Sequence, residues 1–116
     1  SSWFNAGIVS YSNDAKRQFL NVSEDSLERY GAVSQQVVEA MAKGAADLNF
    51  GQVSVAVSGV AGPGGGTSEK PVGTVWIGWS VNEIISSSKF HFEGNREQIR
   101  YQTLIAALEG LLVKLN

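Results

Sequence analysis

One segment limits what this chain can fold into more than any other feature of the sequence. Residues 73–81 read Gly-Thr-Val-Trp-Ile-Gly-Trp-Ser-Val, so a strand formed here would be apolar on both faces. Such a strand has to be covered on both sides, as happens when helices pack on each face of a sheet. The segment therefore predicts a central strand between two helical layers.

Three further segments are predicted to be strands. Residues 6–11 form a short apolar and aromatic run. Residues 53–58 alternate valine with serine and alanine, which gives one branched face and one small face onto which a helix can pack closely. Residues 84–92 follow a turn at 82–83 and have one wet face, so this segment is expected to be the hairpin partner of residues 73–81.

Helices are predicted both before and after these strands. Short helices are expected after Asp14 and after Ser23. A longer amphipathic helix, capped by Ser34, is expected to end near Asn49, and a final helix is expected to begin at Asn95. The apolar stripe of the final helix comprises Ile99, Tyr101, Leu104, Leu108, Leu111, Leu112 and Leu115. Strands mixed with helices in this order favour an α/β fold, a three-layer α/β/α sandwich with a mixed sheet.

Length and composition restrict the classes of function. The 116 residues fit a single domain over residues 1–116. The absence of cysteine excludes disulfides, thiol nucleophiles and zinc-thiolate sites, and fits a reducing compartment such as the cytoplasm. A net charge of −2 argues against a nucleic-acid partner. No apolar run approaches the ~20 residues of a membrane-spanning helix, so no membrane partner is expected.

Only a few residues suggest chemistry by themselves. His91 alternates with Phe90 and Phe92 and is expected to be an ordinary surface histidine. Without a second histidine or clustered acids, no metal site is predicted. The glycine-rich residues 59–66 could gather backbone N–H groups around a phosphate or carboxylate, or could simply turn a surface loop. Lys16 is a solvated charge unless burial lowers its pKa and makes it a general base.

Five segments taken together resemble one protein family. They are residues 7–16, 30–34, 41–44, 57–66 and 69–75, in this order along the chain. They are similar to the CinA C-terminal domain family, whose enzymatic members are nicotinamide-nucleotide amidohydrolases. The resemblance implies hydrolysis of the carboxamide of nicotinamide mononucleotide to the acid, with release of ammonia and with no cofactor. It also implies a homodimer.

The resemblance further implies roles for individual residues. Ser1 matches the catalytic nucleophile of a Ser-Lys dyad, with Ser2 as the alternative if the register shifts by one residue. Tyr11 matches the assisting tyrosine, and Lys16 matches the lysine that takes the hydroxyl proton. The positions implied to bind substrate are Ser58, Gly59, Gly62, Gly64, Gly65 and Arg96.

Members of this family carry a helix and a strand upstream of the part that resembles Ser1 onward. We therefore expect residues 1–116 to be a CinA C-terminal-like domain that is incomplete at its N-terminal side relative to the family. A second function class stays open beside the amidohydrolase. It is a non-catalytic nucleotide-binding or interaction module of a CinA-like protein.

Overall fold

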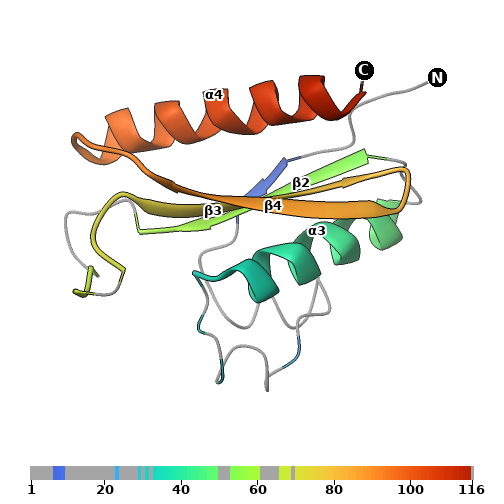
Figure 1. Ribbon diagram of the computed structural model, residues 1–116, viewed down its shortest axis with the longest axis horizontal. Helices are drawn as coiled ribbons and strands as arrows, with labels where there is room; N and C mark the ends of the chain where they lie inside the picture. The colour runs from blue at the N-terminus through green and yellow to red at the C-terminus, as the bar shows by residue number, and fades with distance from the viewer. Residues whose placement is uncertain are drawn as a thin grey trace.

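A mixed β-sheet forms the middle layer, with α3 (Gln35–Asn49) on one face and α4 (Arg96–Leu115) on the other (Figure 1). The computed structural model describes residues 7–9, 23, 29, 31, 33–49, 53–60, 66–68 and 70–115. Within these residues the architecture is the predicted three-layer α/β/α sandwich. The short helices expected after Asp14 and Ser23 lie outside the described residues, apart from isolated positions.

The described sheet has four strands in the order β1-β2-β3-β4. Their bounds are Gly7–Val9, Val53–Gly59, Thr74–Val81 and Ile84–His91. β1 runs parallel to β2, whereas β3 is antiparallel to both β2 and β4, so the sheet is mixed as predicted. β3 lies inside the sheet, and all but one of its eight residues are buried. One apolar face of β3 is therefore covered by α3 and the other by α4, as the sequence predicts.

Small side chains on one face of the sheet let α3 approach closely. The hydroxyl of Ser54 donates a hydrogen bond of 2.5 Å to the carbonyl oxygen of Ala42 in α3. A Cβ on Gly78 of β3 would lie only 2.7 Å from the carbonyl oxygen of Val38. Any larger residue at position 78 would push the helix away from the sheet. The small face predicted for residues 53–58 is thus the face that receives α3.

The opposite face of the sheet is branched and aromatic, and it packs against α4. Trp79 is 2% exposed, and its indole N–H donates a 3.0 Å hydrogen bond to the carbonyl oxygen of Ala107. The valines of β2 and the apolar residues of β3 complete this core with Ile99, Ala107 and Leu111 of α4. The buried residues of α4 are Ile99, Thr103, Ala107 and Leu111.

Both helices begin at the predicted caps. The N–H of Val37 donates to the hydroxyl oxygen of Ser34 over 3.3 Å. At α4 the N–H of Gln98 donates to the side-chain oxygen of Asn95 over 2.9 Å, and the N–H of Asn95 donates back to the side-chain oxygen of Gln98 over 2.8 Å. This reciprocal arrangement satisfies two backbone donors that a helix start leaves unpaired.

The apolar residues of α4 divide between two faces. Ile99 and Leu111 face the sheet, but the other members of the predicted stripe lie between 41% and 66% exposed. These exposed residues are Tyr101, Leu104, Leu108, Leu112 and Leu115. Thr103 and Ala107, two small residues, occupy the sheet-facing positions between Ile99 and Leu111, because the helix lies close to Trp79. None of the described helices is both long and apolar enough to cross a membrane.

The β3-β4 hairpin turns at the two residues predicted. Asn82 and Glu83 have φ values of 50° and 70°, the left-handed conformation that a two-residue type I′ turn requires. Beyond the turn Lys89, His91 and Glu93 are exposed, while Phe90 and Phe92 stack with ring centroids 5.3 Å apart and pack against the core. The prediction that His91 is a surface histidine is consistent with this placement.

Candidate functional site

Three of the residues predicted to form the site lie in the described part of the chain. They are Ser58, Gly59 and Arg96. The remaining predicted site residues fall outside it, namely Ser1, Ser2, Tyr11, Lys16, Gly62, Gly64 and Gly65. The expected Ser-Lys dyad therefore lies outside the described residues.

Ser58 and Gly59 form the end of β2. Ser58 is 3% exposed and lies on the same face of the strand as Ser54 and Ala56, which is the face covered by α3. A Cβ on Gly59 would lie 2.8 Å from Cγ2 of Val75 and 3.0 Å from the carbonyl oxygen of Thr74. Glycine is therefore required at position 59 by the closeness of β3, whatever else the position does.

Backbone hydrogen bonds close the base of the glycine-rich segment directly after β2. The N–H of Val60 donates to the carbonyl oxygen of Thr74 over 2.8 Å, and the N–H of Gly73 donates to the carbonyl oxygen of Val60 over 2.7 Å. These bonds hold the residues before and after the segment together. Val60, at the end of β2, is therefore held beside Gly73 and Thr74, at the start of β3.

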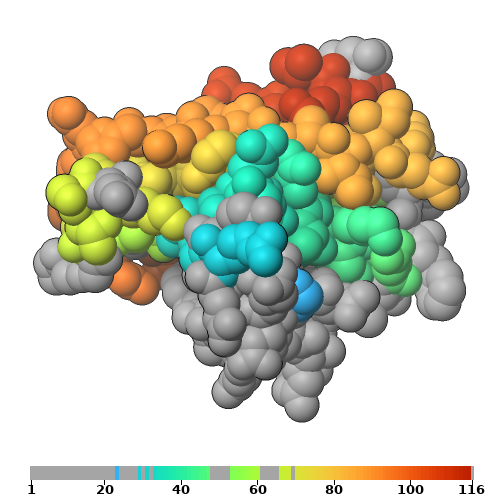
Figure 2. Space-filling model, turned by 60° about the horizontal axis from the view of Figure 1, so that its bottom comes forward, coloured from blue at the N-terminus to red at the C-terminus, as the bar shows by residue number. Residues whose placement is uncertain are grey.

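Lys70, which precedes β3 in the chain, lies beside Gly31, which precedes α3. Thr67 and Lys70 form a turn in which each contributes a 3.0 Å hydrogen bond to the other. The side chain of Lys70 is half-buried beside Gly31, where a Cβ would lie 2.9 Å from the Lys70 ammonium nitrogen. Figure 2 shows this yellow-green part of the chain and the cyan start of α3 on one side of the molecule. The end of β2, the turn at Thr67 and Lys70, and the start of α3 therefore share one end of the sheet.

Arg96 lies at the same end of the sheet but in another layer. It is the exposed first residue of α4, which the chain reaches soon after β4 ends at His91. Ser58 is paired with Trp76, which packs on the α3 side, whereas Arg96 is the first residue of α4. The two helices cover opposite faces of the sheet (Figure 1). The structure therefore places these two predicted substrate residues on opposite sides of the sheet.

Three residues, one on each of β2, β3 and β4, form a row across the strands on the α3 face. The sequence alone did not identify this row. Ser58 of β2 is paired with Trp76 of β3, and Trp76 is paired with Lys89 of β4. Trp76 is half-buried against the apolar residues of α3, and Lys89 is exposed. The two-residue turn at 82–83 could have identified the Trp76–Lys89 pair, because both residues are equally distant from it. The pairing with Ser58 had no such signal, since a long segment separates β2 from β3.

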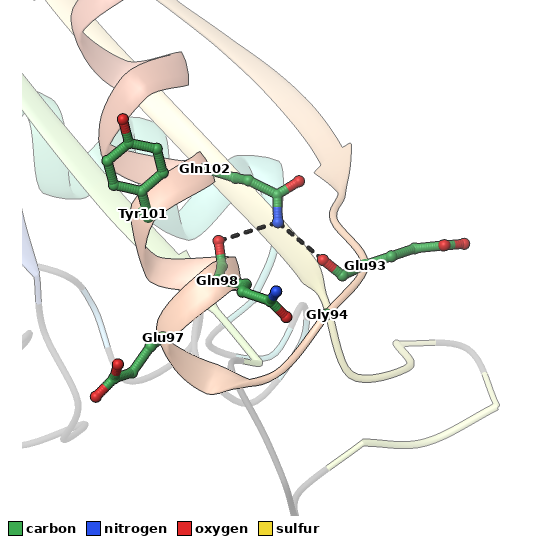
Figure 3. Close-up of a pocket in the computed structure, with 6 residues that line it drawn as sticks. All are labelled: Glu93, Gly94, Glu97, Gln98, Tyr101 and Gln102. Carbon is green, nitrogen blue, oxygen red and sulfur yellow. Dashed lines mark hydrogen bonds between the residues drawn. The ribbon is translucent and has the colours of Figure 1, made fainter.

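A hollow of about 640 Å³ lies at the start of α4 (Figure 3). The side-chain amide of Gln102 bridges its two sides, donating to the carbonyl oxygens of Glu93 over 2.8 Å and of Gln98 over 3.0 Å. The remaining lining residues are Gly94, Glu97 and Tyr101. The hollow includes no predicted site residue, so nothing connects it with the chemistry expected from the sequence. Among the described residues no three His, Asp or Glu side chains converge as metal ligands.

The amino-acid sequence is similar to those of known proteins along nearly its whole length. Nicotinamide-nucleotide amidohydrolase PncC of Pseudomonas putida is 53% identical over 112 residues, which cover 97% of this chain and 70% of the relative. Nicotinamide-nucleotide amidohydrolase PncC of Enterobacter agglomerans is 49% identical over 113 residues, which cover 97% of this chain and 69% of the relative. By their names both relatives are hydrolases.

A solved structure has the same fold. The crystal structure of the competence-damaged protein (CinA) superfamily protein from Enterobacter cloacae superposes with a TM-score of 0.89 and 35% sequence identity. The superposition covers 95% of this chain, but this chain spans only 65% of the length of that protein. The CinA C-terminal domain model matches residues 1–115, so every described residue lies within the match. The fold, the matched length and the similarity to these relatives together establish that this chain belongs to the CinA C-terminal domain family.

Proposed function

We propose that this protein is an amidohydrolase that converts nicotinamide mononucleotide into nicotinic acid mononucleotide and ammonia. One observation carries the proposal. The chain is 53% identical over 97% of its length to a protein named nicotinamide-nucleotide amidohydrolase.

The proposed reaction uses Ser1 as nucleophile, or Ser2 in the alternative register. An uncharged Lys16 takes the hydroxyl proton while the serine oxygen attacks the carboxamide carbon. Backbone N–H groups stabilise the oxyanion that forms, and Tyr11 passes a proton to the departing nitrogen or holds the lysine in place. The C–N bond breaks and releases ammonia. Water then hydrolyses the acyl-serine ester and frees the acid.

Substrate binding is proposed at the end of the sheet where β2 ends. Ser58 is buried there, and Gly59 lets the chain leave β2 in close contact with β3. The following residues Gly62, Gly64 and Gly65 are proposed to direct backbone N–H groups toward the substrate phosphate. Arg96, at the same end of the sheet, is the cation that the family resemblance adds to this set.

Ammonia release tests the assignment and separates it from the second function class. Purified protein incubated with nicotinamide mononucleotide is expected to release ammonia and the acid in equal amounts. Calorimetry on the same sample decides between the alternatives. Heat of binding without turnover would favour a non-catalytic nucleotide-binding module, and neither binding nor turnover would favour an interaction module.

We also propose that residues 1–116 act as one domain of a cytoplasmic homodimer. The exposed apolar residues of α4 support the dimer, because an apolar surface of this extent in a folded protein marks an interaction site. Tyr101, Leu104, Leu112 and Leu115 are spaced symmetrically about Leu108. A two-fold axis through Leu108 would therefore place apolar residues of one copy against apolar residues of the other.

A further inference from the structure

We propose that the row formed by Trp76 and Lys89 binds the nucleotide substrate, with the Trp76 indole against the pyridinium ring and the Lys89 ammonium on the phosphate. The inference rests on the proposed function, since it takes its substrate class from there. It adds two residues that neither the sequence analysis nor the family resemblance assigned to the site.

The register brings the two residues together beside Ser58. Trp76 is directly opposite Ser58 on one side and Lys89 on the other. Residues directly opposite in antiparallel strands have Cβ atoms about 4.5–5.5 Å apart and point to the same face. A buried hydroxyl, an aromatic ring and a cation therefore follow one another across three strands. All three lie at the end of the sheet where the glycine-rich segment begins.

Trp76 has the chemistry and the support to hold a pyridinium ring. Nicotinamide mononucleotide carries a positive charge on its pyridine nitrogen, and indole is the side chain that attracts such cations most strongly. One side of Trp76 packs against the apolar residues of α3, while the residue as a whole is only half-buried. The ring is therefore fixed in place by the helix and still reachable by a ligand.

Lys89 is placed to meet a phosphate. Its side chain is exposed, and His91 lies two residues further along the same face, also exposed. Glu39 of α3 is an acid that faces this part of β4, and Glu93, which is exposed, follows His91 by two residues. The Glu39 carboxylate accepts hydrogen bonds from the Ser87 hydroxyl over 2.5 Å and from the Gln35 amide over 3.2 Å. The Glu39 carboxylate is thus held at Ser87, two residues along the strand from Lys89.

The layers of the fold distinguish Lys89 from Arg96. Lys89 shares the α3 face with Ser58, whereas Arg96 begins the helix that covers the opposite face. A phosphate bound on the Ser58 side of the sheet would therefore meet Lys89 first. Lys89 and Arg96 are therefore alternative candidates for the contact with the substrate phosphate, and variants of the two residues can be compared directly.

Two substrates that differ only by the phosphate test the role of Lys89. The variant Lys89→Met is expected to raise KM for nicotinamide mononucleotide roughly tenfold or more, the factor expected for loss of a charge-assisted hydrogen bond. KM for nicotinamide riboside, which lacks the phosphate, should not change. Lys43→Met is the matched control, because Lys43 is an exposed lysine paired with Asp47 in α3. Arg96→Met is expected to have a smaller effect than Lys89→Met.

The ring at position 76 is tested with two variants. Trp76→Leu is expected to raise KM for both substrates, while Trp76→Phe, which keeps an aromatic face, should recover most of the affinity. Thermal unfolding of each variant separates this effect from a loss of the packing against α3. A Trp76→Leu protein that is folded and has an unchanged KM would overturn the role of the ring.

The outcomes also separate this proposal from the proposed function. If the wild type releases no ammonia, the proposed amidohydrolase activity is rejected. Calorimetry with nicotinamide mononucleotide then tests nucleotide binding by Trp76 and Lys89 independently of turnover. Binding that weakens in Lys89→Met and Trp76→Leu but not in Lys43→Met supports the row even without turnover. Turnover or binding that is insensitive to Lys89→Met, or no nucleotide binding at all, overturns it.

Discussion

Gly110 of α4 lies directly against the indole ring of Trp79. A Cβ on Gly110 would lie 2.3 Å from Cζ2 and 2.7 Å from Cε2 of the ring, so no other residue fits without movement. The same indole donates a hydrogen bond to Ala107, and the ammonium of Lys114 lies 4.2 Å from the ring centroid. Three successive turns of α4 thus hold one buried side chain of β3. This contact attaches the helix to the sheet.

Gly110→Ala should therefore destabilise the protein, although alanine is the better helix former. We expect the free energy of unfolding to fall by about 1–3 kcal/mol, the usual cost of overpacking a core. Urea unfolding of the variant measures it. Glu109→Ala, at the adjacent exposed position, is the control and should change stability little. A Gly110→Ala protein as stable as the wild type would show that the contact is looser than described.

Asn95→Ala should lower the free energy of unfolding by about 1 kcal/mol, because it removes the cap of α4. Asn95→Asp keeps an oxygen that can accept the hydrogen bond from the Gln98 N–H, and should retain most of the stability. Thermal unfolding of both variants checks this pair. Equal losses in the two variants would mean that the side-chain oxygen does not cap the helix.

Gly59→Ala should distort the end of β2, since its Cβ would press on Val75 and on the backbone of Thr74. We expect a loss of about 1–3 kcal/mol in stability together with a higher KM. A double-mutant cycle with Val75→Ala measures the coupling, because the smaller side chain makes room for the new methyl group. The double mutant should be less destabilised than the sum of the two single variants. Strict additivity would contradict the close contact between positions 59 and 75.

Leu108→Glu should convert the proposed homodimer into a monomer, because the charge would lie at the two-fold axis against its own copy. Light scattering at several protein concentrations gives the mass of each species. Gln36→Glu changes an exposed residue of α3, on the opposite side of the sheet from α4, so it should leave the mass unchanged. A monomeric wild type would reject the dimer.

Most of the fold could be predicted from local signals in the sequence. Apolar residues on both faces of residues 73–81 predicted the interior strand, and Ser34 and Asn95 predicted the helix starts, because strand periodicity and capping depend on neighbouring residues. The division of α4 into two apolar faces was not predicted. Which face meets the sheet is decided by Trp79, which makes small residues such as Ala107 and Gly110 preferable to leucine at the contact.

The candidate site was less predictable, because which residues are neighbours in it depends on contacts between distant parts of the chain. Ser58 and Gly59 stand out locally, because a glycine-rich run follows an alternating strand. Their neighbours Trp76 and Lys89 depend on strand register, which is set by contacts between residues far apart in the chain. The position of Arg96 in the other layer likewise depends on which face α4 covers.

The most direct test of the proposed function is ammonia release from nicotinamide mononucleotide by the wild type and by Lys16→Ala, assayed side by side. We expect stoichiometric release by the wild type and a loss of at least about 100-fold in Lys16→Ala, because removing a general base typically costs 10²–10⁴-fold. Release that is unchanged in Lys16→Ala, or absent from the folded wild type, would contradict the proposed function.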